Sequence, residues 1–213
     1  MKDVGAGEPG ALAPQVYLLD DDELVLRTLT RVLRRAGYRV AVYASPTAFL
    51  AGAALTPPCC LLLDVHMPEM GGEQIQLKVQ GTATPPPIVF ISGGSDIPTS
   101  VRVMKAGAVD FLPKPFANKD LLAAVASALR VAEERRRAGD GAREAQARLA
   151  RLTPRERQVC DGVARGLKSK EIAAELGAAV KTVNVHRSRV MAKLGVSSVA
   201  ALVKLVEKAG GRS

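Results

Sequence analysis

The sequence predicts an α/β domain with a mainly parallel sheet, followed by a smaller domain made only of helices. Over residues 14–130, short segments rich in β-branched and aliphatic residues alternate with segments whose apolar residues recur at helical spacing. Strands that alternate with helices form right-handed βαβ units, which place a parallel sheet between two layers of helices. After residue 151 the chain has four helical patterns and no convincing strand.

Five segments have the composition of short strands, and the stretches between them carry helix signals. One helix start is marked by Ser45 as a candidate N-cap, followed by Pro46 at the first helical position. Another is marked by Thr153-Pro154 with Glu156 completing a capping box. The expected strands are residues 16–19, 38–43, 60–65, 88–92 and 109–112.

Composition divides the chain into four segments. Residues 1–13 read as a flexible leader without the basic and apolar regions of a signal peptide. Residues 14–130 form the α/β domain, and residues 151–213 form the helical one. Between them, residues 131–150 form a charged, partly helical linker, with a break expected at residues 138–141. The apolar runs are too short to cross a membrane.

Charge is unevenly distributed along the chain. Residues 1–125 carry 11 Lys and Arg against 12 Asp and Glu, whereas residues 126–213 carry 19 against 9. The basic excess of the C-terminal part suggests that it meets a polyanion, although basic surfaces also occur without such a role. The three cysteines match neither a disulfide framework nor a zinc pattern, and we expect buried reduced thiols in a cytoplasmic protein.

Polar side chains cluster at the carboxyl ends of the expected strands. An Asp-Asp-Asp run at residues 20–22 directly follows the first strand, and Asp64 lies near the end of the third. Ser92 ends the fourth strand, and Lys114 follows the fifth. In an open parallel sheet, ligands bind outside the carboxyl ends of the strands. We therefore expect these residues to form one site.

The residue types at this edge favour phosphoryl transfer. Clustered carboxylates repel one another and need a cation, and Mg²⁺ prefers oxygen ligands. A magnesium ion neutralises an incoming phosphoryl donor and leaves one carboxylate free to attack it. The Ser92 hydroxyl and the Lys114 ammonium can then bind the transferred oxygens. Each residue alone is equally consistent with an acidic turn, a helix cap or a surface lysine; the set together favours a site.

The same residues lie in motifs that resemble those of response-regulator receiver domains. The motifs are Leu-Leu-Asp-Asp-Asp at 18–22, Leu-Asp-Val-His-Met-Pro-Glu-Met-Gly-Gly at 63–72, Ile-Ser-Gly at 91–93 and Lys-Pro-Phe at 114–116. The resemblance covers about residues 14–130. It implies a flavodoxin-like fold with a five-stranded parallel sheet in the order 2-1-3-4-5. It also implies that Asp64 is the phosphoacceptor.

Further site assignments follow from this resemblance. Asp20, Asp21, Asp64 and the backbone carbonyl of His66 would bind Mg²⁺, and a cis-prone Lys114-Pro115 bond would aim Lys114 into the site.

Ser92 and Phe111 match the family's switch pair. A phosphoryl group would draw the Ser92 hydroxyl towards it, and the Phe111 ring would turn inward and reshape the surface of the fourth helix, fifth strand and fifth helix. From the residues alone, Phe111 is equally an ordinary core aromatic.

The C-terminal part contains a helix-turn-helix pattern. Residues 171–177 read as a short helix closed by Gly177. A longer basic helix begins near Val180 and runs to Leu194. A short helix, a tight turn and a longer basic helix are typical of DNA-binding domains.

Advancing 100° per residue separates the faces of the longer helix. Val183, Val190 and Leu194 form a core stripe. His186 lies close to the edge of the core, where we expect it to be packed or hydrogen-bonded and not a base contact or metal ligand. Opposite the core, polar side chains face outward, although they could form only a solvated basic surface. The candidate DNA contacts are Lys181, Asn184, Val185 and Ser188 for bases, and Thr182, Arg187, Arg189 and Lys193 for phosphates.

Residues 150–208 resemble LuxR-type DNA-binding domains. The matching runs include Leu-Thr-Pro-Arg-Glu-Arg-Gln-Val at 152–159 and Lys-Thr-Val-Asn-Val-His-Arg at 181–187. Together with the receiver, the chain resembles response regulators of the FixJ/NarL class. In one departure, Ala178-Ala179 stands where the family usually has a Ser or Thr cap. Loss of an N-cap costs about 1 kcal/mol, so we expect the first turn, with Lys181, to be less firmly fixed.

The two resemblances imply a transcriptional response regulator of a two-component phosphorelay, not an enzyme. A sensor histidine kinase would phosphorylate Asp64, and an active homodimer would bind paired half-sites in promoter DNA. One alternative is a phosphorylation-independent DNA-binding regulator that uses the receiver as a dimerisation module. Another is a phosphotransferase or nucleotide-binding enzyme, but the first strand leads into acidic residues and has no glycine-rich phosphate loop.

Overall fold

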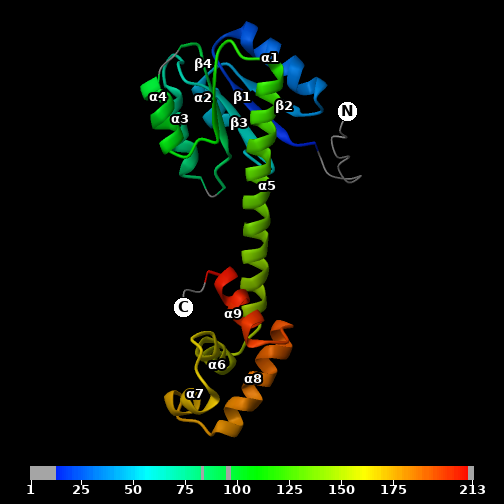
Figure 1. Ribbon diagram of the computed structural model, residues 1–213, viewed down its shortest axis with the longest axis vertical. Helices are drawn as coiled ribbons and strands as arrows, with labels where there is room; N and C mark the ends of the chain where they lie inside the picture. Colours follow the sequence, from blue (N-terminus) through cyan, green and yellow to red (C-terminus); the bar gives the residue numbers. More distant parts are fainter. Residues whose placement is uncertain (1–12, 83, 95–96, 211–213) are drawn as a thin grey trace. The chain divides into compact units, whose positions relative to one another are not determined.

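The computed structural model of the chain describes residues 13–82, 84–94 and 97–210 (Figure 1). Its contacts divide the chain into two compact units, Met1–Arg136 and Arg137–Ser213. The expected leader lies outside the described residues except for Ala13. No helix within the described ranges is long and apolar enough to cross a membrane.

Unit 1 contains a five-stranded sheet in which every neighbouring pair of strands is parallel. The order is β2-β1-β3-β4-β5, which confirms the expected topology. Each strand lies within one or two residues of its expected position. The strands are β1 Gln15–Leu19, β2 Arg39–Tyr43, β3 Cys59–Asp64, β4 Ile88–Ser92 and β5 Asp110–Pro113.

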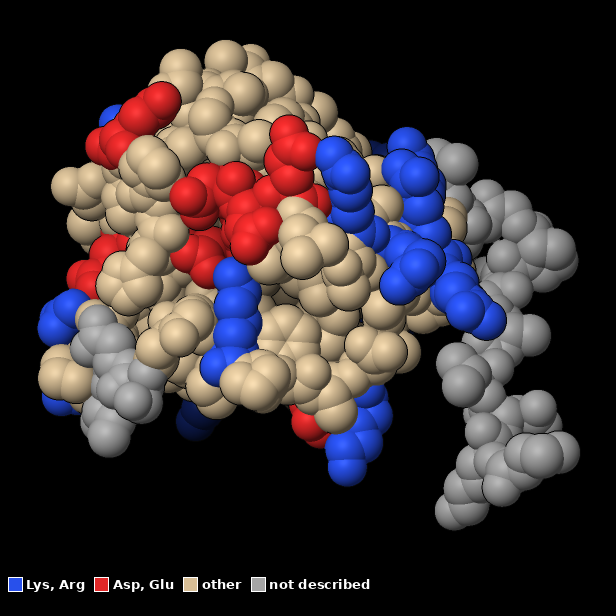
Figure 2. Space-filling model, turned by 90° about the horizontal axis from the view of Figure 1, so that it is seen from above, with Lys and Arg blue, Asp and Glu red and all other residues tan. Residues whose placement is uncertain are grey.

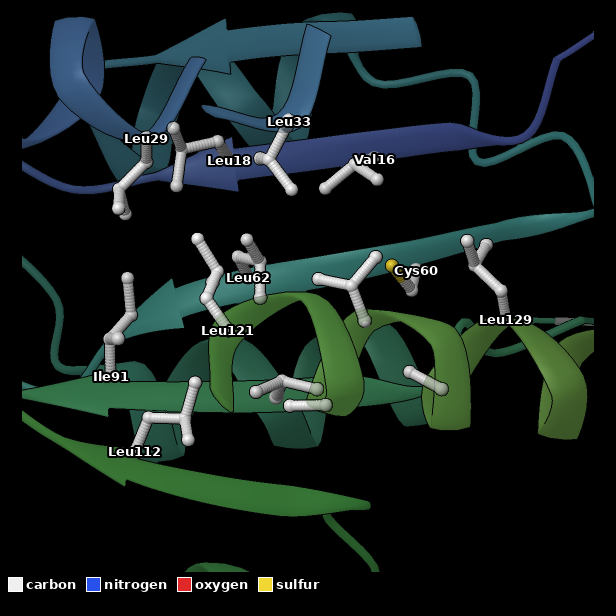
Figure 3. Packing of buried hydrophobic residues seen from close by; sticks show 14 of the residues in the cluster. Val16, Leu18, Leu29, Leu33, Cys60, Leu62, Ile91, Leu112, Leu121 and Leu129 are labelled. Carbon is white, nitrogen blue, oxygen red and sulfur yellow. The ribbon is translucent and has the colours of Figure 1, made fainter. Parts of the chain in front are cut away.

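Helices cover both faces of this sheet (Figure 1). Because successive strand residues point to opposite faces, Val16 and Leu18 pack with α1 and α5, whereas Tyr17 and Leu19 pack with α2, α3 and α4. Figure 3 shows the first of these two clusters, in which Leu29 and other α1 and α5 side chains meet the strands. The helices are α1 Glu23–Arg35, α2 Pro46–Gly52, α3 Gly72–Gln80, α4 Ile97–Lys105 and α5 Asn118–Leu149.

The register of the strands brings their carboxyl ends to one edge. Leu19 of β1 lies opposite Leu63 of β3, so the residues that follow, Asp20 and Asp64, are neighbours across the two strands. Ser92 of β4 pairs with Pro113 of β5, and the backbone N–H of Lys114 donates to the Ser92 carbonyl at 2.7 Å. The polar residues predicted to share an edge therefore do so.

α5 does not break where the sequence led us to expect. Residues 138–141 are helical, so that expectation is wrong. Each glycine in this stretch costs about 1 kcal/mol relative to alanine within a helix. Ion pairs such as Arg148–Glu144, at 2.6 Å, each stabilise the helix by a few tenths of a kcal/mol. The burial of Ala145 adds a tertiary contribution to helix stability.

Unit 2 consists of the end of α5 and the helices α6 Pro154–Ala164, α7 Ser169–Glu175, α8 Val180–Leu194 and α9 Val199–Lys208. The predicted capping box at the start of α6 is present, with Thr153 and Glu156 bonded reciprocally. Gly195 has a φ of 64°, and this left-handed conformation ends α8. One apolar cluster joins the helices, including Leu149, Val159, Ile172, Val190 and Leu202.

Candidate functional site

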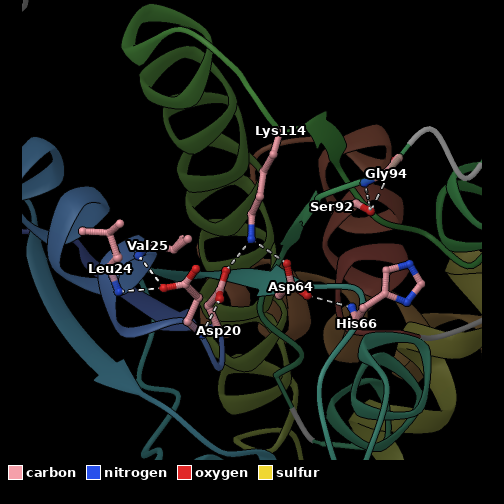
Figure 4. A network of polar contacts seen from close by, with 9 residues as sticks. Asp20, Leu24, Val25, Asp64, His66, Ser92, Gly94 and Lys114 are labelled. Atoms are coloured by element: carbon pink, nitrogen blue, oxygen red, sulfur yellow. Dashed lines mark hydrogen bonds and ion pairs between the residues drawn. The ribbon is translucent and has the colours of Figure 1, made fainter.

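A lysine and two aspartates form the centre of the polar edge in unit 1. Lys114 Nζ lies 2.7 Å from Asp20 Oδ2 and 2.8 Å from Asp64 Oδ1 (Figure 4). Asp20 and Asp64 are 1% and 5% exposed, so both carboxylates are buried. A buried carboxylate requires a compensating partner, and one ammonium serves both.

Backbone groups hold the second oxygen of each carboxylate. The N–H of His66 donates to Asp64 Oδ2 at 2.7 Å, and the N–H of Asp22 donates to Asp20 Oδ1 at 2.9 Å. Asp22 itself caps α1 and accepts from the N–H of Leu24 at 2.8 Å. The acidic run after β1 is thus divided in function, because Asp20 faces the site and Asp22 begins the helix.

Burial and the neighbouring charges shift the pKa of Asp64 in opposite directions, and the same holds for the pKa of Lys114. Burial raises the pKa of Asp64 above its usual value and outweighs the lowering effect of Lys114. For Lys114, burial acts to lower the pKa, but its bonds to Asp20 and Asp64 outweigh burial and raise it. Lys114 is therefore protonated at neutral pH. Two carboxylates share one ammonium, so the cluster has an excess of carboxylates that favours a second cation.

The chemistry of the donors at this edge suits Mg²⁺. The available ligands are carboxylate and carbonyl oxygens, which this ion prefers. Asp20 and Asp64 face the same ammonium, but Asp21 is exposed, and the part of the chain that the structure describes gathers no group of three or more metal-ligating side chains. Acidic side chains nevertheless gather in one patch on the face seen in Figure 2.

Ser92 and Phe111 lie on neighbouring strands. Ser92 is completely buried, and its Oγ lies 3.5 Å from both the N–H and the carbonyl of Gly94, at the limit of a hydrogen bond. Phe111 is half-buried and packs against the α2–α3–α4 side of the sheet. The Lys114-Pro115 bond is cis, as expected.

Gly72 has a role in the site that was not predicted from the sequence. A Cβ at this position would lie 2.6 Å from the carbonyl oxygen of Asp64 and 2.8 Å from Cε1 of Phe90. Glycine is therefore required for α3 to begin directly against the end of β3. The sequence feature that could have indicated this role is the Gly71-Gly72 pair, which comes after Asp64 in the chain.

In unit 2, α8 has the two faces that its sequence predicts. Val183, Val190 and Leu194 are each 1% exposed and form the core side. On the opposite side, Val185 is 45% exposed. Of the other candidate DNA contacts, Arg187 is half-buried and the remaining side chains are exposed, namely Lys181, Thr182, Asn184, Ser188, Arg189 and Lys193.

The remaining residues of α8 refine this arrangement. Its N-cap is Ala179, which makes no side-chain cap hydrogen bond. His186 is half-buried, and its Nδ1 is buried and has no hydrogen-bond partner among the residues that the structure describes, so of the two expectations packing fits this atom. Lys193 forms an ion pair with Glu156 at 2.7 Å, a contact that the helical projection could not reveal.

These two units define a class of protein, a receiver joined to a helix-turn-helix domain. Residues 16–126 match the family model described as response regulator receiver domain. Residues 150–206 match the model of the bacterial regulatory proteins of the luxR family.

Several relatives match this chain over most of its length and most of their own. Response regulator protein TmoT of Ectopseudomonas mendocina is 42% identical over 193 residues, which span 91% of this chain and 88% of that protein. The transcriptional regulatory protein FixJ of Bradyrhizobium diazoefficiens is 37% identical over 195 residues, spanning 92% and 95%. The solved structure of the response regulator StyR is 43% identical, covers 92% of this chain and 100% of its own, and has a TM-score of 0.78.

The chain therefore belongs to the transcriptional response regulators of two-component systems that combine a receiver with a LuxR-type DNA-binding domain. This is a family of regulators and not an enzyme class. Receiver domains generally bind Mg²⁺. The two domains imply a histidine kinase and DNA as partners.

Proposed function

We propose that phosphorylation of Asp64 switches the DNA binding of α8. The observation that carries this proposal is the buried pair Asp20 and Asp64 bridged by Lys114. A nucleophilic carboxylate and a cation that can neutralise phosphoryl oxygens are the two groups that the reaction requires.

The proposed reaction transfers a phosphoryl group from a kinase histidine. A carboxylate oxygen of Asp64 attacks phosphorus as the bond from phosphorus to the histidine nitrogen breaks, which leaves an acyl phosphate on Asp64. The His66 N–H holds Oδ2, whereas Oδ1 faces Lys114. We propose that the Lys114 ammonium moves from the free carboxylate to the phosphoryl oxygens as their charge appears.

Asp20, Asp21, Asp64 and the backbone carbonyl of His66 are the proposed Mg²⁺ ligands. The bound ion would supply charge neutralisation for the phosphoryl oxygens. Asp20 and Asp64 already lie together, and exposed Asp21 directly follows Asp20 in the chain.

Ser92 and Phe111 are the proposed link from the site to the surface. Among the residues that the structure describes, the Ser92 hydroxyl bonds only to Gly94, and both bonds are long, so little in this part of the chain opposes its movement towards a phosphoryl group. Phe111 is only half-buried, and an inward turn of its ring would alter the surface of α4, β5 and α5. We propose that this change favours a homodimer, which binds two half-sites.

We propose that α8 is the DNA-contacting helix. Its outward side chains offer hydrogen bonds to base edges, an apolar contact for a thymine methyl and cations for phosphates. The proposed contacts are Lys181, Thr182, Asn184, Val185, Arg187, Ser188 and Arg189. Because the proposed partner is DNA, we propose that the protein is cytoplasmic. We also propose that it has no enzymatic turnover.

Acetyl phosphate tests the phosphoacceptor directly. With Mg²⁺, the wild-type chain should gain one phosphoryl group by intact mass, and Asp64→Asn should gain none. Asp120→Asn, an exposed carboxylate in the first turn of α5, is the matched control and should be labelled like the wild type. Undiminished labelling of Asp64→Asn would overturn the assignment.

A further inference from the structure

A buried glutamate in unit 2 links the start of α6 to the end of α8. Glu156 is 3% exposed, although it lies in the first turn of a surface helix. Its Oε2 accepts from Lys193 Nζ at 2.7 Å and from the backbone N–H of Thr153 at 2.9 Å. One carboxylate oxygen therefore joins the chain just before α6 to the last turn of α8.

A second contact connects the same regions. Arg148, in the last turn of α5, donates from Nη1 to the Leu194 carbonyl at 3.5 Å, at the long limit of a hydrogen bond. Next to it, Leu149 is 3% exposed and packs in the core of unit 2. The residues around the junction of α5 and α6 thus contact the end of α8 through both polar and apolar groups.

The burial of Glu156 constrains what Lys193 can do. If Lys193 turned to a DNA phosphate, Glu156 would keep its charge in a buried position without its cation. Removing one partner of a buried ion pair is strongly unfavourable, whereas an exposed phosphate contact contributes modestly. The pair therefore opposes the use of Lys193 as a phosphate contact, in contrast to the expectation from the helical projection.

We propose that Glu156 and Lys193 form a clamp that fixes α8 relative to the α5–α6 junction. Lys193 is then a positioning residue and does not contact DNA. The clamp also gives a physical route by which a shift at the end of α5 reaches the DNA-contacting helix, because Thr153 follows α5 closely and bonds to Glu156. This inference rests on the proposed DNA contact by α8.

The change in DNA affinity caused by Glu156→Gln distinguishes the clamp from a phosphate contact by Lys193, because the two predict different directions of change. Glutamine can still serve as the third residue of the capping box, so the variant removes mainly the charge. The probe is a duplex selected from a random-sequence library with the full wild-type chain. If the clamp positions α8, Glu156→Gln and Lys193→Met should each weaken binding about tenfold, and Lys193→Arg should retain most of it. If Lys193 contacts phosphate, Glu156→Gln should leave binding unchanged or tighter, because it frees a cation and removes an anion.

The salt dependence of binding gives a second, independent readout. Loss of a phosphate contact lowers the slope of log affinity against log salt by about 1. The clamp predicts that Lys193→Met changes this slope no more than Lys204→Met, the loss of an exposed lysine on α9. A slope reduced by about 1 in Lys193→Met alone would overturn the proposal.

Amide hydrogen exchange tests the clamp without DNA. Glu156→Gln and Lys193→Met should both speed exchange in the last turn of α8 more than in α7, and the double variant should add little to either. Unchanged exchange at the end of α8 would overturn the clamp. If the wild type selects no duplex, the proposed DNA contact is wrong. The amide exchange rates at the end of α8 still test the clamp in that case.

Discussion

Gly72 lies so close to Asp64 that no other residue fits without displacing the site. A Cβ on Gly72 would come within 2.6 Å of the Asp64 carbonyl oxygen, and the nearest atoms are backbone and a packed aromatic ring. The position of Asp64 thus depends on a residue with no side chain of its own. At Gly71, a Cβ would meet only the Val65 carbonyl oxygen, at an ordinary contact distance of 3.7 Å.

Gly72→Ala should destabilise unit 1 and slow phosphorylation of Asp64. Overpacking of this kind costs about 1–3 kcal/mol, because the β3 backbone or the Phe90 ring must move. Thermal unfolding of unit 1 and the rate of labelling by acetyl phosphate measure the two effects. Gly71→Ala is the matched control, and an equal loss in both variants would contradict the close approach at Gly72.

Ala179→Ser should stabilise unit 2 by about 1 kcal/mol, because it supplies the missing N-cap of α8. The backbone of Ala179, with φ −72° and ψ 142°, already has the extended conformation of a cap residue. Urea unfolding of the helical unit measures the gain. Ala178→Ser, one residue before the cap, should give no comparable gain, and the reverse order would contradict the cap assignment.

Acid should weaken unit 2 through Glu156. The hydrogen bond from Lys193, followed by that from the Thr153 N–H, lowers the pKa of Glu156 from 4.5 to about 2. Because the folded pKa lies below the unfolded one, this stabilisation is fully present above pH 4.5 and is lost as the pH falls towards 2. The stability difference between the wild type and Glu156→Gln should therefore shrink over this range. A difference that is independent of pH would contradict the pairing.

Asn184→Ala and Arg189→Met should affect DNA binding differently. Loss of a base contact at Asn184 should cost about 1–3 kcal/mol on the selected duplex and little on random-sequence DNA. Loss of a phosphate contact at Arg189, an exposed residue of α8, should weaken both and reduce the salt slope by about 1. Affinity titrations over a range of salt concentrations measure both effects. Equal losses on the two DNAs for Asn184→Ala would argue against base recognition by this residue.

The parallel sheet and the polar edge were predictable because they depend on short-range patterns. Alternating strands and helices specify the topology, and a parallel sheet then brings Asp20, Asp64 and Lys114 together. The packing requirement at Gly72 was not predictable from these patterns, because it depends on how closely α3 approaches β3. The exposed and buried faces of α8 followed from a rotation of 100° per residue.

Two other features depended on contacts that no local pattern contains. The helix continues through residues 138–141 although two glycines disfavour it, and the Arg148–Glu144 ion pair and the burial of Ala145 stabilise the helix just after them. Lys193 projects to a flank of α8 that suits phosphate, yet its partner is Glu156, 37 residues earlier in the chain. Tertiary pairing decides the role of such a residue.

The most direct test of the account is DNA affinity with and without beryllofluoride and Mg²⁺, which together mimic the phosphorylated state. The full wild-type chain should bind the selected duplex more tightly with the mimic than without it. Asp64→Asn should bind with one affinity in both conditions. An unchanged affinity of the wild type, or an equal enhancement in Asp64→Asn, would contradict the claim that Asp64 controls the DNA-binding unit.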